Sequence, residues 1–160
     1  MNWLKEGLKS SDAAFKIIMN SVPITAFPYF SGKDTWIGYP AQRDELLKFI
    51  DHYNIPGILW ISGDLHFASV GKVSKEGPGS TQQEILAGPG AQIPDYLCLP
   101  LNMNSQFEWV SARNNYITVH FDPHKMDVEL VYQGGAEDPE ETQFDKIAEI
   151  YRTKFNLGKK

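Results

Sequence analysis

The sequence predicts an α/β protein in which a strand–helix–strand unit is followed by a β-meander. The run Ile58–Ser62 is apolar and rich in β-forming residues, which is typical of a central strand. An amphipathic segment at residues 41–53 precedes it, and a short apolar segment at residues 15–22 comes earlier still. After Ala68 the pattern changes to short strands separated by turns. Strands that alternate with a helix indicate the α/β class.

The first two predicted elements are a helix end and a strand. Residues 1–9 are expected to be the last turns of a helix, with Trp3, Leu4 and Leu8 on one face. Residues 15–22 are expected to form a largely buried strand that ends at Pro23, because proline cannot donate a hydrogen bond to a sheet.

An irregular segment at residues 24–39 separates this strand from the next helix. It is rich in Gly and Pro and has no periodic pattern. Long irregular loops inside compact domains are usually either functional or disordered. The aromatic side chains of this segment favour an ordered loop; they are Phe27, Tyr29, Phe30 and Trp36.

The amphipathic segment begins at Pro40, which suits the first position of a helix. Its helix is expected to extend to Tyr53 and to end at the turn Asn54–Gly57. The predicted inner face consists of Leu46, Leu47, Phe49 and Ile50.

The second half of the chain is expected to consist mainly of strands. Two strands at residues 69–74 and 83–86 flank a turn at residues 76–79, and a Gly/Pro-rich loop covers residues 88–104. The predicted meander comprises residues 107–111, 116–121 and 128–132, with one turn at residues 122–125. Residues 134–141 read as an acidic linker, and residues 144–155 as an amphipathic helix or a final strand, with the strand favoured.

The composition limits the classes of function. With 160 residues and a net charge of -5, the chain is one domain or a piece of one and has no basic stripe for a nucleic-acid backbone. No segment is apolar enough to span a bilayer, and residues 1–6 do not resemble a signal peptide. The single cysteine, Cys98, excludes an internal disulfide and a cysteine-based zinc site, and its apolar neighbours indicate a small buried residue.

The strongest local motif is Ser62-Gly63-Asp64-Leu65-His66, which comes directly after the predicted central strand. Ligands of open α/β sheets bind beyond the carboxyl ends of the strands, so Asp64 and His66 are well placed for a functional site. A carboxylate and an imidazole two residues apart can converge on one metal ion or phosphate. The alternative is an aspartate that caps a turn beside a hydrogen-bonded histidine, and spacing alone does not separate the two interpretations.

A second motif, Asp34-Thr35-Trp36-Ile37-Gly38-Tyr39, lies in the loop before the helix. A right-handed crossover would place it at the same edge of the sheet. Asp34 is a candidate ligand for a hard cation, while Trp36 and Tyr39 are candidates to wall a pocket. The alternative is an aromatic loop that only covers the core.

Together the two motifs resemble the PhoD-like metallophosphatases. Their signature couples Asp-x-Trp-x-Gly-Tyr-x-x-x-Arg to a Gly-Asp-Val-His turn, which this chain matches at residues 34–43 and 63–66, with Leu65 in place of valine. The similarity is good from about Trp3 to Ala91 and weak beyond it. The two motifs in sequence are specific, whereas Gly-Asp-x-His alone would not be.

The resemblance implies an α/β/β/α sandwich and a cluster of two or more metal ions, typically iron and calcium. By this analogy His66 would be a metal ligand, Asp64 a ligand or a group that orients one, and Asp34 a calcium-type ligand. Arg43 would hold the loop by hydrogen bonds. Two further polar residues, Asn20 and His120, are weighed mainly as structural.

The family takes most of its metal ligands from its N-terminal half, yet only 33 residues precede Asp34. Residues 1–160 are therefore expected to be the C-terminal portion of a single phosphatase domain that lacks the N-terminal metal motifs. The expected activity is hydrolysis of phosphomonoesters or phosphodiesters, with the rest of the site supplied by a missing N-terminal polypeptide or by an oligomer.

Two other interpretations remain. The chain could be a catalytically incomplete subunit or remnant that binds a partner polypeptide. Less favoured is a small-ligand binding module that uses the aromatic loop at residues 27–39. An extracytoplasmic location is expected from the family alone.

Overall fold

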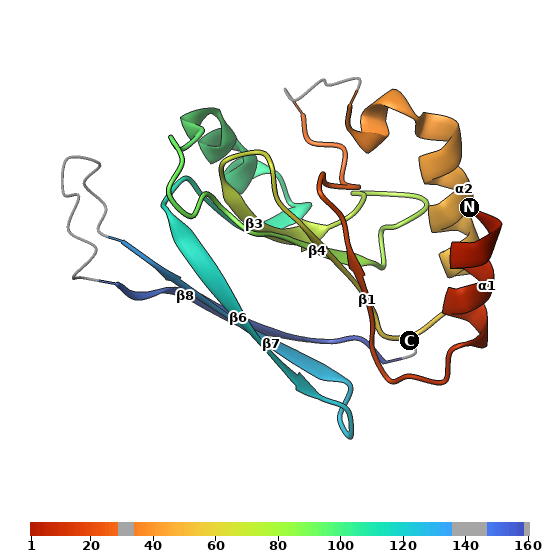
Figure 1. Ribbon diagram of the computed structural model, residues 1–160. Helices are drawn as coiled ribbons and strands as arrows, with labels where there is room; N and C mark the ends of the chain where they lie inside the picture. The colour runs from red at the N-terminus through yellow and green to blue at the C-terminus, as the bar shows by residue number, and fades with distance from the viewer. Residues whose placement is uncertain (29–33, 136–146, 159–160) are drawn as a thin grey trace.

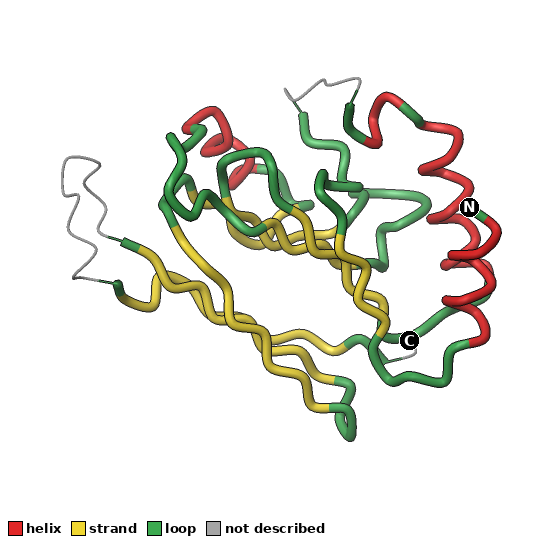
Figure 2. Tube along the Cα trace, viewed as in Figure 1, coloured by secondary structure: helices red, strands yellow, loops and turns green. Residues whose placement is uncertain are grey.

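The computed structural model describes residues 1–28, 34–135 and 147–158, which form two packed β-sheets with helices on one side (Figure 1). Figure 2 shows the helices beside the first sheet, on the side away from the second sheet. The α/β class predicted from the sequence is therefore confirmed. Within the described ranges, no helix is long and apolar enough to cross a membrane.

The first sheet is mixed and has the strand order β1-β2-β4-β3-β5. Strands β1, β2 and β4 run parallel, whereas β3 is antiparallel to both β4 and β5. The strands span Lys16–Met19 (β1), Ile58–Ser62 (β2), Ala68–Lys72 (β3), Gln83–Leu86 (β4) and Phe107–Ser111 (β5). Strand β2 therefore lies inside the sheet, with one parallel neighbour on each side.

The second sheet is an antiparallel meander in the order β6-β7-β8. Residues 107–111, which were predicted to belong to the meander, pair instead with β3 in the first sheet. Its strands span Asn115–Asp122 (β6), Asp127–Gly134 (β7) and Ala148–Asn156 (β8). The tail of the chain is thus a strand, as favoured from the sequence, and not an amphipathic helix. Residues 136–146, which include most of the predicted acidic linker, lie outside the described residues.

The two sheets bury an apolar layer between them. Leu59 of β2 and Ile85 of β4 pack in one cluster with Leu130 and Tyr132 of β7. Tyr132 is fully buried, and its hydroxyl donates a 3.1 Å hydrogen bond to the carbonyl of Ser69. Burial of aromatic and aliphatic side chains is the main force that holds the two sheets together.

The helices cover the opposite face of the first sheet. Helix α1 spans Asn2–Ser10 and α2 spans Pro40–His52. Because neighbouring side chains of a strand point to opposite faces, Trp60 of β2 points to this side while Leu59 points to the other. Trp60 packs there with buried residues of the two helices, which include Leu8, Leu46, Leu47 and Ile50.

Several sequence-based details were wrong. Trp3 is 86% exposed and does not share the buried face of α1 with Leu8, because five residues at about 100° each place the two side chains about 140° apart around the helix. The Gly/Pro-rich loop contains a 3₁₀ helix, η2, at Tyr96–Met103. Strand β1 is shorter than the predicted 15–22, and β3 starts and ends earlier than predicted. Cys98 is buried, as expected.

Candidate functional site

The carboxyl ends of β1 and β2 lie side by side because the two strands are parallel, with Met19 opposite Ile61. Asn20 follows β1, and its backbone amide donates a 2.9 Å hydrogen bond to the Ile61 carbonyl. The turn Gly63–His66 follows β2 directly. Chain topology therefore brings Asn20 to the edge of the sheet from which the Asp64 and His66 turn departs.

Two residues of this turn have left-handed backbone conformations. The φ angle is 79° at Asp64 and 54° at His66, a region that costs non-glycine residues free energy. Both side chains are exposed, whereas Leu65 between them packs on the buried cluster around Phe67 and Leu86. A strained turn that presents a carboxylate and an imidazole to solvent is typical of functional sites.

The His66 ring is held by backbone groups of the loop at residues 88–95. Its Nδ1 lies 3.0 Å from the carbonyl oxygen of Ile93, and the Asp95 amide donates a 2.9 Å hydrogen bond to the His66 carbonyl. A carbonyl can only accept, so this contact requires the proton on Nδ1 and leaves Nε2 of the neutral ring as a lone-pair donor. Metal-binding histidines commonly have this arrangement.

Asn20 carries an unsatisfied polar atom. Its Nδ2 is buried and has no hydrogen-bond partner among the described residues. Buried polar atoms without partners are rare and require an explanation, such as a water molecule, an ion or a ligand. The sequence favours a mainly structural role for Asn20, yet its side-chain nitrogen has no partner among the described residues.

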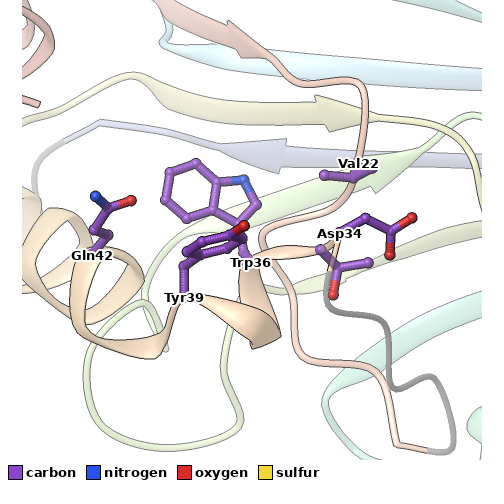
Figure 3. A pocket seen from close by; sticks show the side chains of 6 residues that line it. Val22, Asp34, Trp36, Tyr39 and Gln42 are labelled. Atoms are coloured by element: carbon purple, nitrogen blue, oxygen red, sulfur yellow. The ribbon is translucent and has the colours of Figure 1, made fainter.

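The second motif lines a separate shallow pocket of about 230 Å³. Figure 3 shows the rings of Trp36 and Tyr39 between Gln42 and Asp34, and Val22 is a further lining residue. Trp36 begins the short 3₁₀ helix η1 (Trp36–Gly38) and packs partly against the helix-side core. Asp34 and Tyr39 are exposed. The neighbouring aromatics Tyr29 and Phe30 lie outside the described residues.

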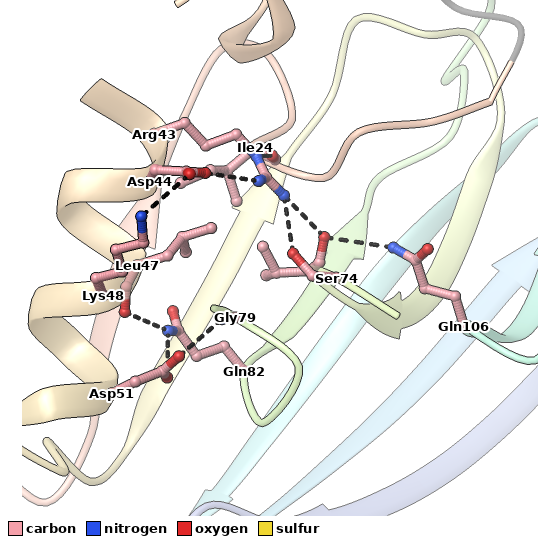
Figure 4. A network of polar contacts seen from close by, with 11 residues as sticks. Ile24, Arg43, Asp44, Leu47, Lys48, Asp51, Ser74, Gly79, Gln82 and Gln106 are labelled. Atoms are coloured by element: carbon pink, nitrogen blue, oxygen red, sulfur yellow. Dashed lines mark hydrogen bonds and ion pairs between the residues drawn. The ribbon is translucent and has the colours of Figure 1, made fainter. Parts of the chain in front are cut away.

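Arg43 joins α2 to the loop that follows β1. Its Nε donates a 2.6 Å hydrogen bond to the Ile24 carbonyl, and its Nη2 donates to the Val73 carbonyl and the Ser74 hydroxyl, each at 3.1 Å. Figure 4 shows these bonds beside a second set in which Asp51 contacts Gly79. Burial lowers the pKa of the guanidinium from its ordinary value, and the nearby carboxylates of Asp44 and Glu84 oppose this effect.

Glu84 of β4 fixes the same loop from inside and was not identified from the sequence. Its carboxylate accepts hydrogen bonds from the backbone amides of Ile24, at 3.0 Å, and Thr25, at 2.8 Å, and from the Ser62 hydroxyl at 2.8 Å. Burial raises the pKa of this carboxyl, against the effect of the hydrogen bonds. A glutamate inside an otherwise buried strand was the available signal, since buried charged residues are rare without a purpose.

The structure does not assemble the three predicted metal ligands into one cluster. Within the part of the chain that it describes, no group of three or more His, Cys, Asp or Glu side chains could hold a metal ion. Asp64 and His66 share one turn, and Asp34 lines the pocket of Trp36 and Tyr39. His120 belongs to β6 of the other sheet. A metal centre here would need ligands beyond these residues.

Comparisons with known proteins agree on one family. The model of the family described as "PhoD-like phosphatase" matches residues 1–130. Alkaline phosphatase D of Bacillus subtilis (strain 168) is 32% identical over an alignment of 71 residues, and the match covers 40% of this chain and 12% of that protein. A solved structure titled "Structure of PhoD" superimposes with a TM-score of 0.72 at 18% identity, covering 98% of this chain and 32% of that chain. The chain thus spans about a third of the solved relative, with which it shares the fold.

Proposed function

This chain belongs to the PhoD-like phosphatase family, and we propose that it forms the C-terminal part of the domain of a metal-dependent phosphoester hydrolase. Family membership supports phosphoester hydrolysis as the general activity. Because the chain covers 32% of the solved relative, we assign it a contribution to the active site and not the whole site.

One observation carries the proposal, namely the geometry of the turn after β2. The turn holds Asp64 and His66 in left-handed conformations at the carboxyl end of an internal parallel strand. The Ile93 carbonyl lies 3.0 Å from Nδ1 of His66 and accepts a hydrogen bond from it, so the lone pair on Nε2 is available to a metal ion. Residues in strained backbone conformations cluster at active sites and ligand clamps, so two of them with exposed polar side chains in one turn support a functional role.

The donor set fits part of a metal site. An imidazole nitrogen suits iron and similar transition metals, whereas the carboxylates of Asp64 and Asp34 suit both iron and a harder cation such as calcium. When bound, two such ions supply electrostatic stabilisation of the phosphate and an activated water molecule. We therefore propose His66 and Asp64 as ligands of one site and Asp34 as a calcium-type ligand. These three side chains do not complete a two-metal centre.

The other predicted site residues have supporting roles in this proposal. Trp36 and Tyr39 form an aromatic wall beside Asp34, which suits the organic group of a phosphomonoester or phosphodiester. The buried Nδ2 of Asn20 has a free N–H donor, which suits a phosphate oxygen or a bound water. Arg43 holds the loop that leads to this wall, because all three of its hydrogen bonds are to protein groups outside the pocket.

The proposal is tested by the metal content of the purified and extensively dialysed chain, measured by plasma mass spectrometry. We expect retained iron or calcium that is lost in His66→Gln and in Asp64→Asn and is kept in His120→Gln, a matched change in the second sheet. The same preparations are assayed with p-nitrophenyl phosphate and bis-p-nitrophenyl phosphate. Equal metal loss in all three variants, or metal that is insensitive to all of them, contradicts the assigned ligands.

A second candidate function is a partner-binding module without activity of its own, and the edge of the first sheet favours it. Strand β1 lies at this edge, with Ile17 37% and Met19 78% exposed. An apolar edge strand readily pairs with another chain. This second function would be favoured if the wild-type chain retained no metal and associated with another chain in a way that Met19→Lys abolishes.

A further inference from the structure

The loop that holds His66 is exposed at its tip and needs anchors elsewhere. Residues 90–93 are exposed, and the Ile93 side chain is 83% exposed, so side-chain packing does not fix the Ile93 carbonyl. This carbonyl nevertheless accepts the hydrogen bond from Nδ1 of His66. Whatever holds the loop therefore also sets the orientation of the imidazole.

Two asparagines at the start of β6 provide these anchors. When its side-chain amide is oriented so that both polar atoms are satisfied, Asn114 donates hydrogen bonds from Nδ2 to two loop carbonyls, those of Pro89 at 3.0 Å and Gln92 at 3.2 Å. The backbone amide of Asn115 donates a 2.9 Å hydrogen bond to Pro89, and its side-chain oxygen accepts a 3.3 Å bond from the Gly88 amide. Asn115 itself is buried.

The fit between the loop and Asn115 is close. A Cβ atom at Gly88 would lie 2.1 Å from Nδ2 of the Asn115 side chain, so a larger residue at position 88 would displace that side chain. Pro89, the next residue, is buried and accepts from both asparagines. The loop is therefore attached to the second sheet at its first two residues and again at Gln92, next to Ile93.

We propose that Asn114 and Asn115 are positioning residues for His66, which act through the loop at residues 88–93 and fix its ring as the Nδ1–H tautomer. The Asn114 side chain holds the backbone at Gln92, so the following carbonyl stays within reach of the ring. The second sheet thereby takes part in the site that the first sheet carries. The role of this tautomer in metal binding rests on the proposed function. The inference that the asparagines fix the tautomer does not depend on that function.

The test is a long-range ¹H–¹⁵N correlation spectrum of the ¹⁵N-labelled full chain at a pH of about 8.5, where ordinary histidines are neutral. His66→Gln identifies the His66 signals. We expect the wild-type ring to carry its proton on Nδ1, and we expect Asn114→Asp to lose this signature, because a carboxylate facing two carbonyls repels the loop. Asn114→Ala, which removes the donor without adding charge, is expected to give the same loss.

The matched control is Asn156→Asp. The side chain of Asn156 also donates hydrogen bonds to a backbone oxygen, that of Lys125, and to a side-chain oxygen, that of Asp127. Asn156 lies far from the loop, because it pairs with Asp127 at one end of β7, whereas Asn115 pairs with Gly134 at the other end. It should leave the His66 tautomer unchanged. An Nε2–H tautomer in the wild type, an unchanged tautomer in both Asn114 variants, or equal losses in Asn114→Asp and Asn156→Asp would each overturn the inference. Addition of Zn²⁺ alone then tests the proposed function separately, since only a metal ligand should show a selective change at Nε2 of His66.

Discussion

The Ser62 hydroxyl donates a 2.8 Å hydrogen bond to the Glu84 carboxylate, which joins the end of β2 to β4 directly beneath the turn of Asp64 and His66. The same carboxylate accepts hydrogen bonds from the backbone amides of Ile24 and Thr25. One buried side chain thus holds both loops that leave this edge of the sheet. The site residues are exposed, but the groups that place them are buried.

Glu84 should make stability depend on pH. Burial raises its pKa, so the folded state binds this proton more tightly than the unfolded state. The resulting stabilisation is fully present below the ordinary carboxyl pKa of about 4.3 and is lost as the pH rises through the raised value. Each tenfold difference in proton affinity corresponds to about 1.4 kcal/mol.

The measurement is urea unfolding of the wild type and Glu84→Gln between pH 4.5 and pH 8. We expect the unfolding free energy of the wild type to fall relative to that of the variant, which has no carboxyl to titrate at this position. Parallel curves would show that Glu84 has the same proton affinity in both states and would contradict this prediction.

Arg43→Lys should destabilise the protein by about 2 kcal/mol, because an ammonium cannot reproduce the three divergent hydrogen bonds of the guanidinium. Arg152→Lys is the matched control. Arg152 is paired with Glu129 and Glu149, but these ion pairs are exposed to solvent, so its substitution should change stability much less than Arg43→Lys does. Equal effects of the two substitutions in urea unfolding would show that Arg43 does not hold the loop.

The conformation of Asp64 can be tested through its backbone. At a φ of 79°, alanine is strained whereas glycine is not, so Asp64→Gly should be about 1 kcal/mol more stable than Asp64→Ala. The control pair is Asp12→Gly and Asp12→Ala on an exposed residue without positive φ, where alanine should be at least as stable. If alanine equals glycine at position 64 as well, the turn is not left-handed in solution.

Much of the fold could be predicted from local pattern. Strands β2, β4 and β5 have the predicted bounds, because each is a short apolar run between clear turn residues. Helix α2 begins at the predicted Pro40. The order of β3 and β4 could not be predicted, since β4 inserts beside β2 and leaves β3 outside it. That choice depends on which strand ends fit together in space.

The site could be predicted only in part, because it also depends on contacts between residues that are distant in the sequence. The motif at residues 62–66 and its place after a central strand follow from sequence, but the partner of His66 lies 27 residues away in an irregular loop. The contacts of Glu84 span about 60 residues. Backbone carbonyls carry no sequence signal, so no pattern indicates that Ile93 supplies one. Whether Asp34, Asp64 and His66 bind metal remains a prediction.

Gly57 should be the least replaceable glycine of those near the first sheet. Its φ is 74°, and a Cβ there would lie 1.9 Å from the Ala14 carbonyl oxygen, a backbone atom that cannot move without shifting β1. The carbonyl of Gly57 also accepts the Lys16 amide, the first bond of that strand, at 2.7 Å. Gly57→Ala should therefore cost about 3 kcal/mol or more in urea unfolding.

Gly77→Ala, with a φ of 67° but open space, isolates the backbone effect and should cost about 1 kcal/mol. Gly7→Ala lies in α1 with nothing within 4 Å and should stabilise by up to about 1 kcal/mol. If Gly57→Ala costs no more than Gly77→Ala, β1 does not approach this turn as closely as the structure places it.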